Sequence, residues 1–197
     1  MHLNLKAPLH LSLLLAAVML LCAGEASAQF VRLYGNNQEN SFGKVIPTGP
    51  GYYALGSNAG VATITYVNLN GQHQWTRLLN MPSVLTDAVL MTNSSNLLFV
   101  GYTLPLSSAN QSIIGTVDPS GFVSSVIAYD TPGQEELTKV VANPSPSGGY
   151  SVLGYHSPNG PEEVVLLTLD ANAVITDKDR LAGIGSVFTN DLDLFGN

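Results

Sequence analysis

Cysteine and positive charge are scarce in this sequence of 197 residues. Its only cysteine, Cys22, falls in an N-terminal apolar segment, so the rest of the chain can form no disulfide, no thiolate nucleophile and no cysteine-based metal site. Seven Lys and Arg residues stand against 14 Asp and Glu residues, which gives a net charge of −7. This balance, without any basic cluster, argues against a nucleic-acid-binding surface and against a patch for anionic membranes.

Catalytic motifs are also missing. The sequence has no HExxH zinc motif, no Gly-rich phosphate loop and no GxSxG nucleophile elbow. Beyond residue 28 the only histidines are His73 and His156, which we expect at the surface in structural roles. The pairs Glu135–Glu136 and Glu162–Glu163 fall in expected loops, and neighbours on an extended chain point to opposite sides. Neither pair makes a glycosidase site by itself. We therefore predict no catalytic residue, no metal site and no cofactor.

Only one apolar run is long, and it lies near the N-terminus. Residues 11–23 form an apolar stretch of 13 residues, too short to cross a bilayer, and small residues at 26–28 fit a cleavage site. We interpret residues 1–28 as a signal peptide, which predicts a secreted or cell-surface protein without membrane insertion after cleavage. Lipidation of Cys22 is an open alternative, although Leu21 is larger than the residue that this processing prefers.

The rest of the chain contains a repeat of about 50 residues. Three short apolar runs end in a marker glycine, namely GYYALGS (51–57), NLLFVGY (96–102) and GYSVLGY (149–155). Each is followed by a second strand-like run, a turn and a third run, and each is preceded by a fourth run. The runs are rich in Val, Ile, Leu, Thr and Tyr and are bounded by Gly, Pro, Asn and Ser, without a helical period. Each unit is therefore predicted to hold four β-strands.

The turns of the three units predict hairpins of one kind. Their first residues are Asn68, Asp118 and Asp170. An Asn or Asp side chain at this position bonds to the backbone two residues on, and Gly71 and Gly121 supply the positive φ that closes the hairpin. At Ala173 the same geometry would be strained, so we expect that turn to be different or looser.

Four strands per unit at this period favour an all-β, propeller-like fold. We predict about twelve short antiparallel strands in three blades, at roughly 36–80, 81–130 and 131–182. A partial fourth blade is expected at 183–197, within a repeat domain that covers residues 29–197. A plain β-sandwich is the structural alternative, but it would not explain the repeat.

The pattern resembles the tandem β-propeller repeats of secreted proteins from Bacteroidetes-type bacteria, in which YGG, GGYxxxGxT and KLDxxGxxxW recur. The matching stretches here are LYGN (33–36), GYYALGS (51–57) and VNLNGQHQW (67–75), and two further units repeat the pattern. The sequence departs from it at Asn68, where Asp is usual, and at Ala173, where Gly is usual. The resemblance implies a scaffold in a secreted or surface protein and implies no activity.

Trp75, the only tryptophan, lies four residues past Gly71, and His73 lies between them. One interpretation makes Trp75 and His73 a ligand-binding pair, with Trp75 as a platform for a sugar or a base. The other makes Trp75 a rim residue or a packing residue between blades, because the equivalent positions, Ser125 and Asp177, are not aromatic.

Three and a half blades are fewer than the smallest usual ring of four. We therefore expect the chain to be the N-terminal part of a longer propeller, or two copies to complete each other by self-association. Two functions follow from the sequence. One is a non-catalytic scaffold or binding module that holds a protein or a glycan. The alternative is the N-terminal fragment of a propeller-fold extracellular enzyme such as a glycan hydrolase.

Overall fold

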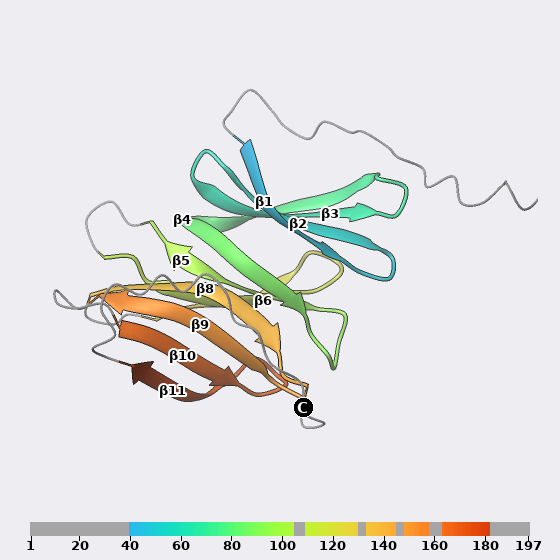
Figure 1. The fold of residues 1–197 in the computed structure, drawn as a ribbon. Helices are drawn as coiled ribbons and strands as arrows, with labels where there is room; N and C mark the ends of the chain where they lie inside the picture. Colours follow the sequence, from blue (N-terminus) through green and yellow to red (C-terminus); the bar gives the residue numbers. More distant parts are fainter. Residues whose placement is uncertain (1–39, 105–108, 130–132, 145–147, 158–162, 182–197) are drawn as a thin grey trace, which may run out of the picture. The chain divides into compact units, whose positions relative to one another are not determined.

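The computed structural model describes residues 40–104, 109–129, 133–144, 148–157 and 163–181. The expected signal peptide and the expected partial fourth blade lie outside these ranges. Every regular element in the described residues is a β-strand, and all strand pairs are antiparallel (Figure 1). The all-β class predicted from the sequence is confirmed. No helix in the described part of the chain is long and apolar enough to span a membrane.

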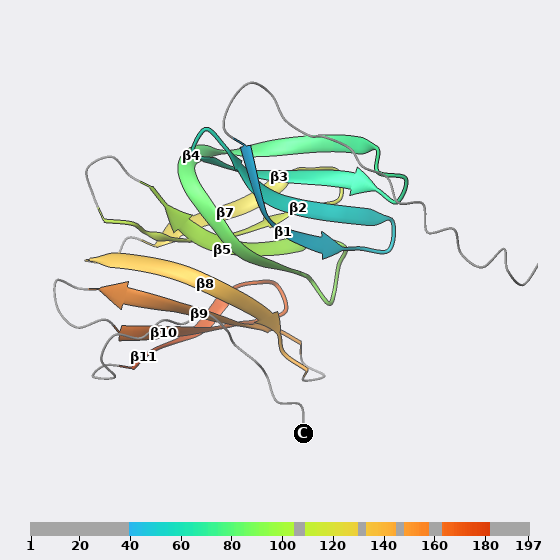
Figure 2. The same cartoon turned by 45° about the horizontal axis from the view of Figure 1, so that its top comes forward.

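The described residues form eleven strands in two sheets. The first sheet has the order β1-β2-β3-β4-β5-β6-β7. Its strands are β1 (Asn40–Pro47), β2 (Gly51–Asn58), β3 (Val61–Asn68), β4 (His73–Leu90), β5 (Leu97–Thr103), β6 (Ser112–Val117) and β7 (Val123–Tyr129). The second sheet has the order β11-β10-β9-β8 (Figure 2). Its strands are β8 (Gln134–Ala142), β9 (Tyr150–Ser157), β10 (Glu163–Leu169) and β11 (Ile175–Leu181).

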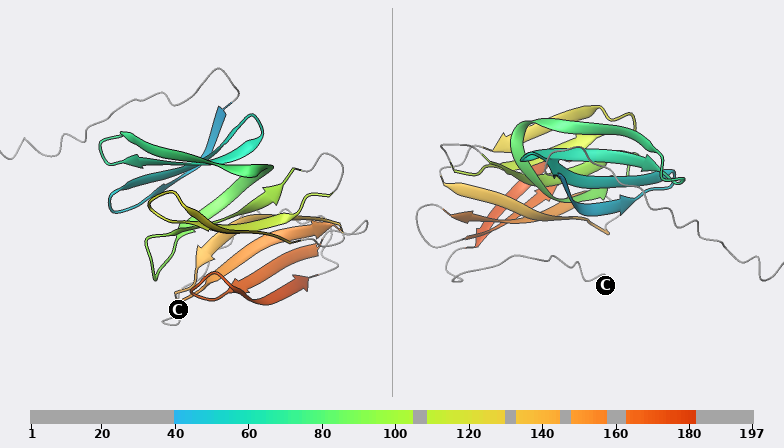
Figure 3. Two further views of the ribbon diagram at one scale, coloured as in Figure 1. Left: turned by 180° about the vertical axis from the view of Figure 1, so that it is seen from behind. Right: turned by 90° about the horizontal axis from the view of Figure 1, so that it is seen from above.

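Strand β4 belongs to two sets of four strands. Its first half pairs with β3, ending at Pro82 opposite Val61, and its second half pairs with β5 from Ser83 onward. Figure 3 shows this long green strand passing from one set to the other. We call β1–β3 with the first half of β4 the first unit, the second half of β4 with β5–β7 the second unit, and β8–β11 the third unit. We expected two strands where β4 is continuous, which accounts for eleven strands instead of about twelve.

Three hairpins, one per unit, have the same five-residue turn. The strand pairs close at Val67 and His73, Val117 and Val123, and Leu169 and Ile175. In each turn the first residue, Asn68, Asp118 or Asp170, accepts backbone N–H groups two and four residues on through its Oδ1. Gly71 has φ 69° and Gly121 has φ 84°, as predicted.

The third turn corrects our expectation about Ala173. This residue has φ 64°, in the left-handed region, and its N–H donates to the Asp170 carbonyl at 3.0 Å. Gly71 and Gly121 make the same bond in their turns. The turn is therefore not looser, because Asp170 Oδ1 fixes it through the N–H groups of Asn172 and Val174. An alanine in this region costs about 1–2 kcal/mol, which the turn tolerates.

Replacing Ala173 with glycine should stabilise the protein. Ala173→Gly removes the strain of the left-handed conformation, and the greater freedom of glycine in the unfolded chain offsets part of the gain. We expect a net increase of about 0.5–1 kcal/mol in the free energy of unfolding, measured by urea titration. Ala171→Gly, in the same turn but without a positive φ, is the control and should destabilise. A loss of stability in Ala173→Gly would contradict this account.

The marker glycines lie opposite β-bulges. In the three units the register shifts between Phe42 and Lys44, between Leu85 and Asp87, and between Leu137 and Lys139. The partner strand approaches Gly56, Gly101 and Gly154 so closely that an added Cβ would lie 2.0–2.4 Å from a backbone oxygen. The glycines are thus required by the bulges, because any side chain would collide with the bulged backbone.

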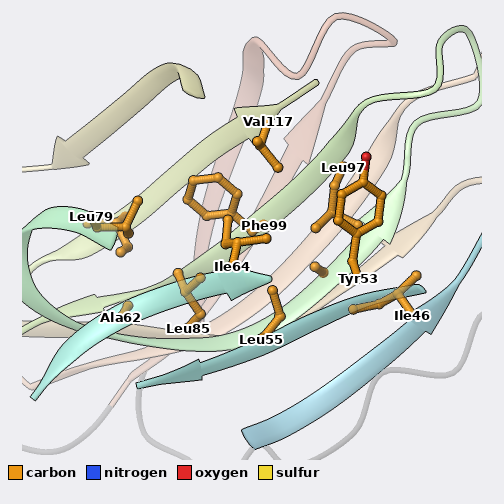
Figure 4. Close-up of a cluster of buried hydrophobic side chains, with 12 residues drawn as sticks. Ile46, Tyr53, Leu55, Ala62, Ile64, Leu79, Leu85, Leu97, Phe99 and Val117 are labelled. Atoms are coloured by element: carbon orange, nitrogen blue, oxygen red, sulfur yellow. The ribbon is translucent and has the colours of Figure 1, made fainter. Parts of the chain in front are cut away.

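Two clusters of buried apolar side chains join the units. The first contains Tyr53, Leu55 and Ile64 of the first unit and Leu97 and Phe99 of the second (Figure 4). The second cluster contains residues of the second unit, Leu98, Val100 and Ile114, and residues of the third unit, Tyr150, Val152, Val165 and Leu167. Neighbouring residues of β5 therefore pack on opposite sides, and the second unit is covered on both faces.

Candidate functional site

Trp75 lies against the β6–β7 turn of the second unit. Its Nε1–H donates to the carbonyl of Pro119 at 3.0 Å, and its ring lies so close to Gly121 that an added Cβ would be 2.8 Å away. The rings of Tyr53 and Tyr66 pack beside it, with centroids 5.8 Å from the Trp75 ring. Trp75 is only partly exposed. This position makes it a packing residue between two units.

His73 contacts Thr76, three residues further along its own strand. Its side chain is exposed, and its Nε2 lies 2.9 Å from Thr76 Oγ1. Thr76 in turn bonds to Thr65 Oγ1 at 2.9 Å. Of the two residues predicted as a ligand-binding pair, Trp75 thus contacts the second unit, and His73 contacts Thr76 on its own strand.

An open groove of about 780 Å³ lies between the first half of β4 and the start of β7. It is lined by residues 77–81 and 120–124. Among the described strands both are sheet edges here, because the first half of β4 pairs with β3 alone and β7 pairs with β6 alone. Leu78 and Phe122 on its walls are 50% and 66% exposed. Sequence reasoning missed this groove, since it joins two segments that are far apart in the sequence.

Arg77 is held at one side of the groove. Its Nε–H donates to the Gly121 carbonyl at 2.6 Å, and its guanidinium carbon lies 5.8 Å from the centre of the Trp75 ring. In the described part of the structure its two terminal nitrogens make no hydrogen bond. A guanidinium fixed in this way can offer two parallel N–H groups to a carboxylate or another planar acceptor.

A smaller cavity of about 350 Å³ lies beside Tyr53 and Tyr66, near the β1–β2, β4–β5 and β6–β7 turns. Burial raises the pKa of Tyr53 to about 12, with smaller contributions from Tyr66 and Asp118. The hydroxyl therefore stays protonated at physiological pH and can donate a hydrogen bond, but it cannot act as a base.

Glu135 and His156 form a buried polar cluster, which corrects two sequence-based expectations. Glu135 and Glu136 lie in strand β8, not in a loop, and His156 in β9 is only 1% exposed. Glu135 accepts hydrogen bonds from Lys178 at 2.9 Å and from Arg180 at 3.4 Å. These two cations lie on β11, the far edge of the same sheet. The cluster thus ties the edge strand to β8, and this contact fits a structural role.

The imidazole of His156 is kept neutral by its surroundings. Burial lowers its pKa, and the Arg180 charge lowers it further, against the opposing effect of Glu135 at 3.7 Å. Because its pKa is lowered, His156 binds fewer protons in the folded protein than in the unfolded chain. A histidine in an unfolded chain titrates near pH 6.5. Stability contributed by the neutral form is present above that value and is lost as the pH falls below it.

Replacing His156 should therefore flatten the acid side of the stability curve. We expect the unfolding midpoint of the wild type to fall as the pH drops below about 6.5, and we expect this loss to be smaller in His156→Gln. Urea titrations at a series of pH values measure it. The same replacement at the exposed His73 is the control and should retain the wild-type loss. Equal pH dependence of wild type and His156→Gln would show that His156 is not the titrating group.

No family model matches the chain, and no curated protein sequence matches it. Among the described residues there is no group of three or more His, Cys, Asp or Glu side chains that could hold a metal ion. The groove beside Arg77 is the candidate functional site, because exposed apolar side chains and a fixed guanidinium line it.

Proposed function

We propose that this protein is a secreted or cell-surface scaffold or binding module built of propeller-type blades, without catalytic activity of its own. The observation that carries this proposal is the recurrence of one unit three times. Each unit has a bulge opposite a glycine and a five-residue turn closed by an Asn or Asp side chain. Repetition of one supersecondary unit is typical of scaffolds whose loops and edges vary for binding.

The propeller interpretation is supported by how the units pack. The side chains one and three residues before the marker glycine of the first unit, Leu55 and Tyr53, face the second unit. The equivalent residues of the second unit, Val100 and Leu98, face the third. Each unit thus uses the same face toward its successor, as blades around a common axis do. Export rests on the pattern of residues 1–28.

The groove between β4 and β7 is the surface best suited to a ligand. It combines two strand edges that pair with no other described strand, exposed apolar side chains and the fixed guanidinium of Arg77. An unpaired edge can add an extended peptide as a further strand, and an aromatic wall with neutral polar groups also suits a glycan. Phe122, which is 66% exposed, would be the apolar anchor of either ligand.

Replacing Phe122 tests this function. Immobilised protein is exposed to a glycan array and to a library of extended peptides, and the binding of any ligand is compared with that of Phe122→Ser. We expect affinity to fall by about tenfold or more, the usual effect of losing an apolar anchor. Val174→Ser is the matched control, because Val174 is the fifth residue of the β10–β11 turn as Phe122 is of the β6–β7 turn.

Equal losses in the two variants would exclude the groove as the binding surface. Absence of any ligand would remove the support for a binding module, and turnover of a bound glycan would favour the alternative of an enzyme fragment.

A further inference from the structure

Arg77 is an exception to the repeat. Counted from the first residue of each five-residue turn, its equivalents in the second and third units are Ile127 and Asp179. The strand register agrees, because each of the three residues lies opposite an Ile or Leu four positions before the turn. The bulges, marker glycines and turns recur because they build the units, whereas the guanidinium occurs in one unit only. This difference indicates a role in the groove that the first unit borders.

The guanidinium of Arg77 is fixed on one side and open on the other. Its Nε–H donates to the Gly121 carbonyl, and its central carbon lies 5.8 Å from the centre of the Trp75 ring. A Cβ on Gly121 would lie 3.0 Å from this Nε, so glycine is what lets the arginine approach so closely. The Arg77 side chain is exposed, and within the described part of the chain its terminal nitrogens make no hydrogen bond. Its outer end therefore presents two N–H donors that one carboxylate can accept together.

The groove offers a single positive charge. Among the described residues that line it, Arg77 alone is charged, and the others are apolar or carry a hydroxyl or an amide group. The whole chain has a net charge of −7. A polyanion would be repelled by the chain as a whole, whereas one carboxylate can pair with Arg77 at short range. Charge complementarity therefore favours a ligand that brings one carboxylate into the groove.

We propose that the groove binds an extended peptide that places one Asp or Glu carboxylate against Arg77 and an apolar side chain against Phe122. This inference rests on the proposed function, because it names the ligand of the same groove. A peptide is favoured over a glycan because both walls are strands whose groove-side edges pair with no other described strand, and such edges bond to an extended chain. Phe122 directly follows Gly121, so the apolar wall begins next to the carbonyl that holds the guanidinium.

Two phage-displayed peptide libraries test the need for a carboxylate. Both contain short random peptides and differ in one respect: the first offers Asp and Glu where the second offers Asn and Gln. Selection on the immobilised protein should enrich the acidic library, with one acidic residue at a constant spacing from an apolar residue. A synthetic binder should lose about tenfold in affinity when its carboxylate is replaced by the amide. Affinity that rises steadily with the number of acidic residues would contradict pairing with a single arginine.

Variants of Arg77 assign the preference to this residue. In Arg77→Gln the acidic peptide should bind no better than its amide form, and the amide form should bind as it does to the wild type, which shows that the groove is intact. Arg77→Lys keeps the charge without the paired N–H groups and should retain only part of the preference. Phe122→Ser is the control, because it should weaken both peptides alike and leave the ratio of their affinities unchanged. A full preference for the acidic peptide in Arg77→Gln would refute the role of Arg77.

The remaining outcomes separate this inference from the proposed function. Equal binding of the acidic and amide peptides would overturn the inference but would leave a binding module. Binding of a glycan, acidic or neutral, without binding of any peptide would have the same consequence. Binding of neither a peptide nor a glycan would overturn the inference and the proposed function together.

Discussion

Freed of residues 1–28, the chain is expected to self-associate instead of remaining a stable monomer. The cause lies on the face of the first unit that turns away from the second. Phe42 and Val45 on β1 are 48% and 58% exposed, and Leu78 on β4 is 50% exposed. The strand register places Phe42 and Leu78 in one row across the sheet, with Gly56 and Thr63 between them. Exposed apolar side chains gathered on one sheet face in this way are typical of an interface.

The size of the effect follows from the area left in water. Apolar surface that stays unburied forgoes about 25 cal/mol for each Å². A few hundred Å² on one sheet face then correspond to roughly 5–10 kcal/mol, comparable to the whole stability of a small domain. Association that covers this face is therefore strongly favoured.

Light scattering after size-exclusion chromatography measures the state of association. We expect a mass above that of a monomer, and a shift toward monomer in the double variant Phe42→Ser, Val45→Thr. Leu69→Thr is the control, because Leu69 is equally exposed at 56% but lies in the β3–β4 turn. A monomeric wild type with a cooperative, high-temperature melt would show that this face is covered within one chain, and the interpretation of an incomplete propeller would fail.

The features that could be predicted from the sequence are those set by a few consecutive residues. The five-residue turns depend on Asn68 or Asp118 at the first position and on Gly71 or Gly121 at the fourth, and all of these were identified correctly. Ala173 was misjudged because the Asp170 side chain outweighs the preference of one residue for negative φ. Local chemistry thus predicts the turns, and it fails only where two local preferences compete.

The features that escaped prediction depend on partners far away in the chain. Glu135 is buried because Lys178 and Arg180, more than 40 residues later, reach it across the sheet. One local feature of the sequence could have predicted the burial of His156. It lies on the same face of its strand as Tyr150 and Val152, because side chains two residues apart on a strand point the same way. No local feature could have predicted the groove beside Arg77, because its two walls come from different units.

The marker glycines lie between these two cases. The repeat identifies Gly56, Gly101 and Gly154 in the sequence. Why glycine is required at these positions becomes clear only from the partner strand in the structure. A bulge places two residues opposite one, and nothing in the run that ends at Gly101 indicates that the bulge lies around Thr86. The positions of these glycines could therefore be predicted from the sequence, but the reason for glycine there follows only from the register of the paired strands.

Gly101→Ala should be the most damaging addition of a single methyl group to this protein. The new Cβ would lie 2.0 Å from the carbonyl oxygen of Val84 and 3.0 Å from the Cα of Leu85. Neither atom belongs to a flexible side chain, so the bulge itself would have to open. Phe99 and Val100, adjacent on β5, are fully buried, and their packing would shift with the strand. We expect a loss of more than about 3 kcal/mol, at the upper end of what overpacking costs.

Gly43→Ala is the matched control for this prediction. Gly43 lies at the equivalent bulge of the first unit, but an added Cβ there would meet nothing within 4 Å, and its φ is not positive. The same methyl group should be neutral there or should stabilise by about 0.5 kcal/mol, because alanine has less freedom than glycine in the unfolded chain. Urea titration of the two variants measures the difference. If both changed stability by the same amount, close approach of the bulged strand could not be the reason why Gly101 is glycine.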